Sequence, residues 1–438
     1  MNLEPNQYKK WYATTFLSAL IGYTLVNLLF VNLVFQPKQE MTAQTITSSP
    51  SEKRQEGNWI WWVTRNYLVK HPDAQIALMG SSQMASASFA IESDSQNVNV
   101  DCVTDKNSRF LSQLVKERTG VDTHTCLFAL GGAMISDQYI IAKTLFTDKH
   151  KPKLVVLGVN PRDFIDNLMP SCASTETFHF MSPYTELGQF ADSNFNSIYS
   201  RMDWTINEML PLKLLKNTVA LSIKHAGDRV LNKFDLSINE DKDLVARDDE
   251  SKGDVAQDGA SDKETKTGNA TILDAIYGKL TEVKPATQII HPGMRFDFMD
   301  NMREYTKRYK SADVPMYTAQ KKYFEEFLTF CQNQNIKVVV VGMPNMWPNR
   351  ELLPQTFWTS FKTYIGDTCL KHDAVFVDHL DDDKLFVTND YIDCVHMNQH
   401  GGKKLLTSVA DAIAKNQKTA QALGAPNTVA ESKKQNNL

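Results

Sequence analysis

Short apolar runs rich in β-branched residues recur along this chain, and they limit its fold more than any other feature. Their length and composition are typical of strands buried on both faces of a parallel sheet. The runs are Ile76–Met79, Thr125–Leu130, Leu154–Val159, Lys337–Val341 and Ala374–Val377. The helix-compatible segments around them are Arg109–Arg118, Ser136–Phe146, Thr318–Asn333 and Leu353–Leu370. This alternation predicts a three-layer α/β/α domain with a five-stranded parallel sheet.

The α/β pattern is interrupted by a long insertion, so the domain is expected in two parts, residues 58–163 and 315–415. Within the insertion, residues 164–314, the segment Asn239–Gly268 is acidic and nearly free of apolar side chains. That composition predicts disorder. The flanking parts carry enough aromatic residues to pack on the domain. The polar tail, residues 416–438, is predicted to be unfolded.

The N-terminal region predicts a membrane anchor. No charged residue occurs from Trp11 to Phe35, a stretch that spans about 37 Å as a helix, enough to cross a bilayer. Residues 1–35 are therefore expected to form a cytoplasmic tip and a transmembrane anchor. Lys9 and Lys10 precede the apolar stretch, which places them on the cytoplasmic side and everything after Phe35 outside. A cleaved secretory signal is the alternative, but the stretch is long and no A-x-A site follows it. Residues 36–57 are polar and predict a tether.

An aromatic cluster follows the tether, in Asn58–Pro72. It predicts either a helix on the membrane surface or a first helix packed on the domain, and the usual burial of large aromatic residues favours packing.

Composition excludes several classes of protein. The net charge of −4 gives no basis for binding nucleic acid through its phosphates. The ten histidines and six cysteines form neither a C-x-x-C pair nor an H-E-x-x-H helix, so no metal site is expected. Outside the cytoplasm, Cys102 and Cys126 could form a disulfide, or each could be a small buried apolar residue, and their spacing does not decide between these.

Polar residues and glycines follow three of the predicted strands, where α/β sheets bind ligands. The first strand ends in Gly80-Ser81-Ser82, the second in Gly131-Gly132, and the third in Gly158-Val-Asn160. Near the C-terminus stands Asp393-Cys-Val-His396.

These residue types suit acyl transfer. A serine hydroxyl such as that of Ser82 needs a base to take its proton, and His396 can be that base. Asp393 is three residues before the histidine, so a turn can bring the two together and fix the histidine tautomer. The backbone amides of Ser82 and Gly132 and the side-chain amide of Asn160 are candidate donors to an oxyanion.

Together these residues resemble the SGNH hydrolases, also called the GDSL family, whose four blocks carry a serine, a glycine, an asparagine and D-x-x-H in this order. Ser82 stands at the nucleophile position, Gly132 or its neighbour Gly131 in the glycine block, Asn160 in the third block, and Asp393 and His396 in the fourth. The resemblance implies a flavodoxin-like fold and a Ser-His-Asp triad that needs no cofactor. It covers the α/β part of the chain and leaves the insertion unexplained.

The G-S-S form, the anchor and the phrase K-P-K-L-V-V-L-G-V-N-P-R-D-F are similar to one membrane-anchored branch of this family. That branch includes proteins of alginate O-acetylation and the D-alanine transfer protein of teichoic acid modification. It implies an extracytoplasmic esterase or O-acyltransferase that acts on envelope or exported polysaccharide beside a membrane-bound O-acyltransferase. The sequence departs from the family pattern at Ser81 and Pro161, which each replace an aspartate.

Each block alone is a weak signal, because serine turns and D-x-x-H segments are also common as purely structural features. Their joint occurrence in family order favours the triad. His400 is a rival base that lacks an aspartate three residues before it. Arg162 could bind a polar substrate or pair with Asp163 at the surface, and Asn398 could bind substrate or shape its loop. A scaffold that keeps the triad as a relic and binds polysaccharide or an acyltransferase is the alternative function.

Overall fold

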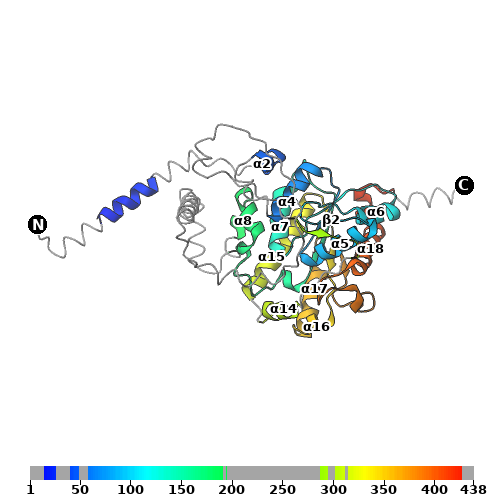
Figure 1. Ribbon diagram of the computed structural model, residues 1–438. Coiled ribbons are helices and arrows are strands. Elements are labelled where there is room, and N and C mark those ends of the chain that lie inside the picture. The colour runs from blue at the N-terminus through cyan, green and yellow to red at the C-terminus, as the bar shows by residue number, and fades with distance from the viewer. Residues whose placement is uncertain are drawn as a thin grey trace, which may run out of the picture. The chain divides into compact units, whose positions relative to one another are not determined.

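The computed structural model describes residues 14–25, 40–48, 58–190, 194, 287–293, 301–310 and 314–426 (Figure 1). Residues 37–201 and 283–438 belong to one compact unit, and residues 1–36 and 202–282 to another. The predicted acidic segment, residues 239–268, lies outside the described residues.

Of the predicted membrane span, residues 14–25 are described and form a helix. Among the described residues, no helix combines the length and the apolar character that crossing a membrane requires.

The predicted parallel sheet is confirmed. All five strands run parallel in the order β3-β1-β4-β6-β7, and Ile76 in β1 lies opposite Thr125 in β3 and Leu154 in β4. The strands are β1 (Ile76–Met79), β3 (Thr125–Leu127), β4 (Leu154–Val159), β6 (Lys337–Gly342) and β7 (Val375–Asp378). β1 and β4 are wholly buried, which explains why they read as unbroken apolar runs.

Helices lie on both faces of the sheet, as right-handed crossovers between parallel strands require (Figure 1). One face carries α5 (Ser82–Gln96), α6 (Arg109–Thr119) and α18 (Gln399–Lys415), and the Arg118 side chain of α6 pairs with Asp411 of α18. The other carries α7 (Ile135–Leu145), α15 (Val314–Asn333) and α17 (Gln355–Lys371). There the rings of Tyr139 and Tyr323 are 5.7 Å apart.

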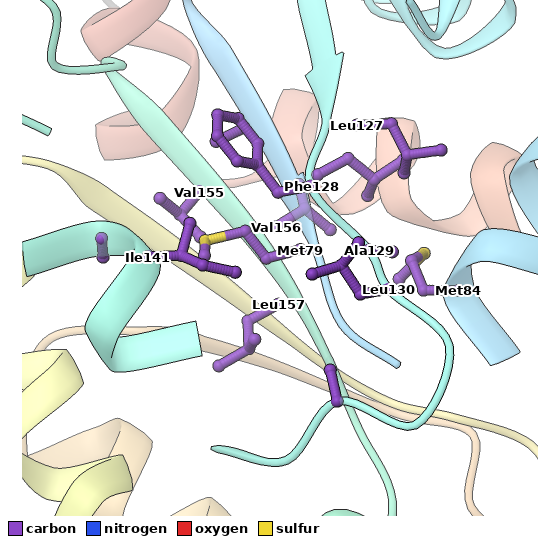
Figure 2. Close-up of a cluster of buried hydrophobic side chains, with 14 of the residues drawn as sticks. Met79, Met84, Leu127, Phe128, Ala129, Leu130, Ile141, Val155, Val156 and Leu157 are labelled. Carbon is purple, nitrogen blue, oxygen red and sulfur yellow. The ribbon is translucent and has the colours of Figure 1, made fainter. Parts of the chain in front are cut away.

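The core is continuous between the sheet and these helices. Figure 2 shows side chains of β1, β4, α7 and the segment after β3 gathered in one buried cluster, among them Met79, Phe128, Ile141 and Leu157.

The aromatic segment after the tether packs on the domain and does not lie exposed. It forms helix α4 (Trp59–Arg65) and a π-helical turn (Asn66–Lys70), and Trp61, Trp62 and Tyr67 are buried. The ring of Tyr67 lies 4.9 Å from that of Phe128. The predicted tether is partly ordered, because α2 (Ala43–Ser48) forms within it and buries Ile46.

Parts of the predicted insertion belong to the same unit as the sheet. β5 (Ile289–Ile290) pairs antiparallel with β2 (Val100–Asp101).

The remaining short elements lie both inside and outside the insertion. They are the helices α8 (Glu176–Met181), α14 (Met302–Arg308) and α16 (Trp347–Arg350), and the 3₁₀ turns Pro161–Asp163, Cys172–Ser174, Ser182–Tyr184, Gly188–Phe190 and Thr388–Asp390.

Order continues beyond Lys415, so the prediction of an unfolded tail is wrong for its first residues. Helix α19 (Gln417–Leu423) is capped by Asn416, whose side-chain oxygen accepts a hydrogen bond from the Thr419 amide, and it buries Leu423. The apolar residues that the tail does contain are enough to dock one short helix.

All six cysteines are buried thiols, so Cys102 and Cys126 are not joined by a disulfide. Burial raises the pKa of Cys102 to about 11, although the charge of Lys106 opposes the shift. Both cysteines behave as small apolar residues, the second of the two alternatives.

Helices α5 and α18 touch backbone to backbone. A Cβ at Gly402 would overlap the carbonyl oxygen of Ala87, so only glycine fits there. The hydroxyl of Ser86 donates to the carbonyl of Met397 at 2.7 Å, just before α18 begins. This contact brings the two ends of the α/β domain together.

We expect the substitution Gly402→Ala to separate these helices and to lower the free energy of unfolding by about 1–3 kcal/mol. Gly366→Ala in α17 is the matched control, because a Cβ there meets only an ordinary contact with Phe376 at 3.7 Å. The control should be neutral or stabilising by up to about 1 kcal/mol. Chemical denaturation measures both, and equal effects of the two substitutions would contradict the close contact.

Candidate active site

The predicted site residues gather where the direction of the crossovers reverses. The chain leaves β1 toward β3 and leaves β4 toward β6, so β1 and β4 are the neighbouring strands at which the sheet order switches. Ser82 follows β1 and Asn160 follows β4. Such a point leaves a crevice at the carboxyl ends of the strands.

Gly80 makes the turn that places Ser82. Its φ of +147° is rarely open to residues with a side chain, and a Cβ there would lie 3.0 Å from Met84 Cβ and 3.2 Å from the Gly158 oxygen. The Gly80 carbonyl accepts hydrogen bonds from the Leu130 amide at 3.1 Å and from Gln138 at 3.0 Å. Ser82 is thereby fixed as the first residue of α5, where its backbone N–H has no intrahelical acceptor.

The three predicted triad residues meet in one hydrogen-bonded chain. Nε2 of His396 is 2.8 Å from Oγ of Ser82, and Nδ1 of His396 is 2.7 Å from Oδ2 of Asp393. Serine and histidine are 314 residues apart in the sequence. This is the geometry in which a histidine accepts a serine proton while a carboxylate orients its ring.

Asp393 is held in its ionised form. Its Oδ1 accepts hydrogen bonds from the backbone amides of Val395 at 2.9 Å and His396 at 2.7 Å. Burial alone would raise the pKa of this carboxyl, but the hydrogen bond and charge of His396 and the two amides outweigh burial and keep the pKa below its ordinary value.

Asn301 is a fourth member of the group that sequence reasoning missed. Its Nδ2 donates to Oδ2 of Asp393 at 2.6 Å and lies 3.3 Å from Nδ1 of His396. It belongs to the predicted insertion and stands just before α14, so no motif of the α/β domain could have indicated it.

Asn398 shapes the loop and does not point to a substrate site. Its Oδ1 caps α18 by accepting from the amides of His400 at 2.9 Å and Gly401 at 3.2 Å, and its Nδ2 donates to the Asn389 carbonyl at 2.7 Å. The cap fixes the loop that carries His396. The rival base His400 is exposed, while Cys394 is buried in a small apolar cluster with Tyr305.

Asn160, the expected side-chain donor to the oxyanion, has one of its two N–H groups engaged inside the protein. It is only 1% exposed, and its Nδ2 donates to Oδ1 of Asn345 at 2.7 Å. Gln83 donates to the same Asn345 oxygen at 3.3 Å and to the Val395 carbonyl at 3.2 Å. Asn160 thus belongs to a buried polar network that joins the ends of β1, β4 and β6 to the histidine loop.

The two candidate glycines differ in position. Gly131 lines the same cavity as Ser82 and His396, whereas Gly132, with a φ of +73°, lines only a neighbouring cavity. Gly131, the alternative in the glycine block, is therefore the one that lies on the wall of the Ser82 cavity.

Arg162 forms a buried ion pair. It therefore fits neither of the two expected roles, binding a polar substrate or pairing with Asp163 at the surface. Its Nη2 lies 2.9 Å from Oδ2 of Asp166, and its Nη1 donates to the Ala133 carbonyl at 2.8 Å. The neighbouring Asp163 accepts a hydrogen bond from the Asn160 amide at 3.0 Å. Burial raises the pKa of this carboxyl to about 7, while Arg162 and the nearby Ser81, which departs from the family pattern, act in the opposite direction.

The cavity beside Ser82 has a volume of about 350 Å³. Its walls come from α4, α5, the segment after β2, the loop at 131, β5 and Asn301, and they are mostly apolar. The lining residues are Trp59, Ser82, Ala85, Ser86, Phe89, Cys102, Gly131, Gln288, Ile290, Asn301 and His396. A second cavity of about 340 Å³ shares Trp59 and Gly131 and is lined on its far side by Ser174, Thr175 and Thr177.

In the part of the chain that the structure describes, no three potential metal ligands come together. A scan against models of protein families and a search of curated protein sequences found no match to this chain.

Lys106 supports the cavity wall from behind. Its Nζ lies 5.2 Å from the ring centres of both Trp59 and Phe89 and donates to the Cys102 carbonyl at 2.7 Å. The side chain is fully buried, and burial lowers its pKa from 10.5 to about 8 against the opposing charges of Cys102, Cys126, Asp101 and Asp105.

This lowered pKa predicts a pH-dependent difference in stability between the wild type and Lys106→Met. Between pH 8 and 10.5 the unfolded chain holds the lysine proton more firmly than the folded chain, so the wild type gains stability relative to the variant as pH rises. The difference in unfolding free energy between the wild type and the variant should change by roughly 2 kcal/mol, in favour of the wild type, between about pH 7 and about pH 10. The other titrating groups occur in both proteins, so a difference independent of pH would show that the lysine is not desolvated.

Proposed function

We propose that this protein is a serine acyl-ester hydrolase or O-acyltransferase. The observation that carries the proposal is the hydrogen-bonded chain from Ser82 through His396 to Asp393, with 2.8 Å and 2.7 Å between its members. A hydrogen bond of this kind to a histidine activates a hydroxyl that is otherwise a poor nucleophile. The cavity that opens on Ser82 gives an ester a place to bind.

In the first half-reaction Ser82 Oγ attacks the ester carbonyl carbon while its proton passes to Nε2 of His396. Asp393 stabilises the imidazolium that forms. The oxyanion lies at the N-terminus of α5, where the Ser82 amide and the α5 dipole favour negative charge, with the backbone at Gly131 close by. Collapse of the intermediate breaks the ester C–O bond, and His396 returns the proton to the leaving alcohol.

In the second half-reaction an acceptor hydroxyl attacks the acyl-serine, again giving its proton to His396. With water as the acceptor the product is a free acid, and with a sugar hydroxyl it is a new ester. Ser82 regains its proton from His396 as the C–O bond to the serine breaks.

The resemblance to SGNH hydrolases supports an envelope or exported polysaccharide as the substrate or acceptor. It also supports an anchor at residues 11–35, an extracytoplasmic catalytic domain, periplasmic or extracellular, and partnership with a membrane-bound O-acyltransferase. A scaffold that binds polysaccharide or the acyltransferase is the second candidate, because Asn160 is buried and its bond to Asn345 occupies one of the two N–H groups that its side chain could offer an oxyanion.

The substitution Ser82→Ala should lower the hydrolysis of p-nitrophenyl acetate by the full-length protein in detergent by at least about 1,000-fold. The same variant should lose labelling by a fluorophosphonate probe, because only an activated serine reacts with it. Ser88→Ala is the matched control, since the Ser88 hydroxyl donates to the Met84 carbonyl within α5 and lies outside the triad. A folded wild type that neither hydrolyses the ester nor takes up the probe would support the scaffold.

Asn301 is expected to act as a positioning residue for the Asp393–His396 pair. Its hydrogen bond disperses the charge of Asp393, so Asn301→Ala leaves a carboxylate that stabilises the imidazolium more strongly. The acid limb of the pH profile of kcat/KM should then move to higher pH by roughly half a unit, and further in Asn301→Asp.

Asn167→Ala is the control for loosening of the same segment. Asn167 donates to the Arg308 carbonyl at 2.8 Å and so holds α14 without touching the triad. The Asn167→Ala variant should leave the acid limb of the kcat/KM profile at the wild-type pH. A lower kcat/KM with an unmoved acid limb in Asn301→Ala would reduce Asn301 to a packing role.

A further inference from the structure

We propose that the cavity beside Ser82 binds the acyl chain of the substrate, and that the chain is an unbranched one of medium length rather than an acetyl group. This inference rests on the proposed function and names the acyl group that the serine accepts.

The cavity follows one side of helix α5 away from the nucleophile. Ala85, Ser86 and Phe89 stand three, four and seven residues after Ser82, so they share a helix face with it. Seven residues of helix cover about 10 Å, so the wall that α5 supplies extends about that far from the reacting oxygen. A linear group bonded to the Ser82 oxygen fits such a shape.

Most polar atoms on the wall already have partners within the protein. The Ser86 hydroxyl donates to the Met397 carbonyl, the Cys102 thiol donates to Gln288 at 3.4 Å, and Asn301 is engaged by Asp393. A sugar buried here would lose its hydrogen bonds to water without finding donors and acceptors in return. An alkyl chain has no such requirement.

The apolar wall is built to hold its shape. The rings of Trp59 and Phe89 both face the ammonium of Lys106, and Ile290 is held by the pairing of β5 with β2. A rigid apolar surface gains binding energy from each methylene that it covers.

The volume excludes a good fit to an acetyl group. A dry cavity of about 150 Å³ accommodates benzene, so about 350 Å³ has room for roughly six or more carbon atoms. With an acetyl group bound, most of the wall would remain against water. Gly131 and Gln288, the exposed lining residues, leave the mouth open for the alcohol part of the ester.

The experiment compares kcat/KM for p-nitrophenyl acetate, butyrate, hexanoate and octanoate with the full-length protein in one detergent. Each buried methylene can raise kcat/KM up to roughly fourfold, so hexanoate should exceed acetate by on the order of tenfold or more. Ala85→Leu fills the cavity next to the nucleophile and should lower the hexanoate-to-acetate ratio by about fivefold or more. Ile290→Ala widens it and should move the optimum to a longer ester.

Ser174→Leu adds a leucine side chain to the second cavity, on the other side of Trp59, and should leave the chain-length profile unchanged. An acetate preference in the wild type, or a profile that Ala85→Leu and Ile290→Ala do not move, overturns the acyl-chain inference while a Ser82-dependent acetate activity still supports the proposed function. Failure to cleave any of the esters, together with no probe labelling, overturns both.

Discussion

Helices α5 and α18 approach each other at Gly402 more closely than any side chain at that position would permit. The first helix begins at Ser82, and the second is entered from the loop that carries His396. The distance between these two helices therefore sets the distance between Ser82 and His396. The 2.8 Å contact at the site depends on a backbone contact at Ala87, further along α5.

Buried polar groups supply the second constraint on the site. Asn345, after β6, accepts hydrogen bonds from Gln83 and Asn160, and Asp163 accepts one from the Asn160 amide. These bonds connect the ends of three strands, and leaving any one of them unmade in the interior would be costly. Because the network is buried and shared, a change at one strand end is felt at the others.

The segment that caps the site comes from outside the α/β pattern. Asn301 touches both Asp393 and His396. Tyr305 of α14 and Tyr309, which follows that helix, pack in one cluster with Val395. Tyr309 also donates to Asn160 at 3.2 Å. The described residues 301–310 of the insertion thus belong to the candidate site, and Gln288 and Ile290, from the same region, line the apolar cavity.

Much of this protein could be predicted from its sequence, because the signals are local. Buried parallel strands need unbroken apolar runs, and a tight turn after β1 needs glycine, so the sheet and the position of Ser82 follow from local signals. The grouping of Ser82 with the distant His396 and Asp393 is expected from the resemblance to the SGNH hydrolases. The partners of Asn160, the burial of Arg162, the contacts of Asn301 and the cavity that Gly131 lines do not follow from the sequence, and the tertiary structure decides them. Each depends on which distant side chain lies within about 3 Å, and hydrogen bonds of that length are decided by the packing of whole helices and strands rather than by neighbours in the chain.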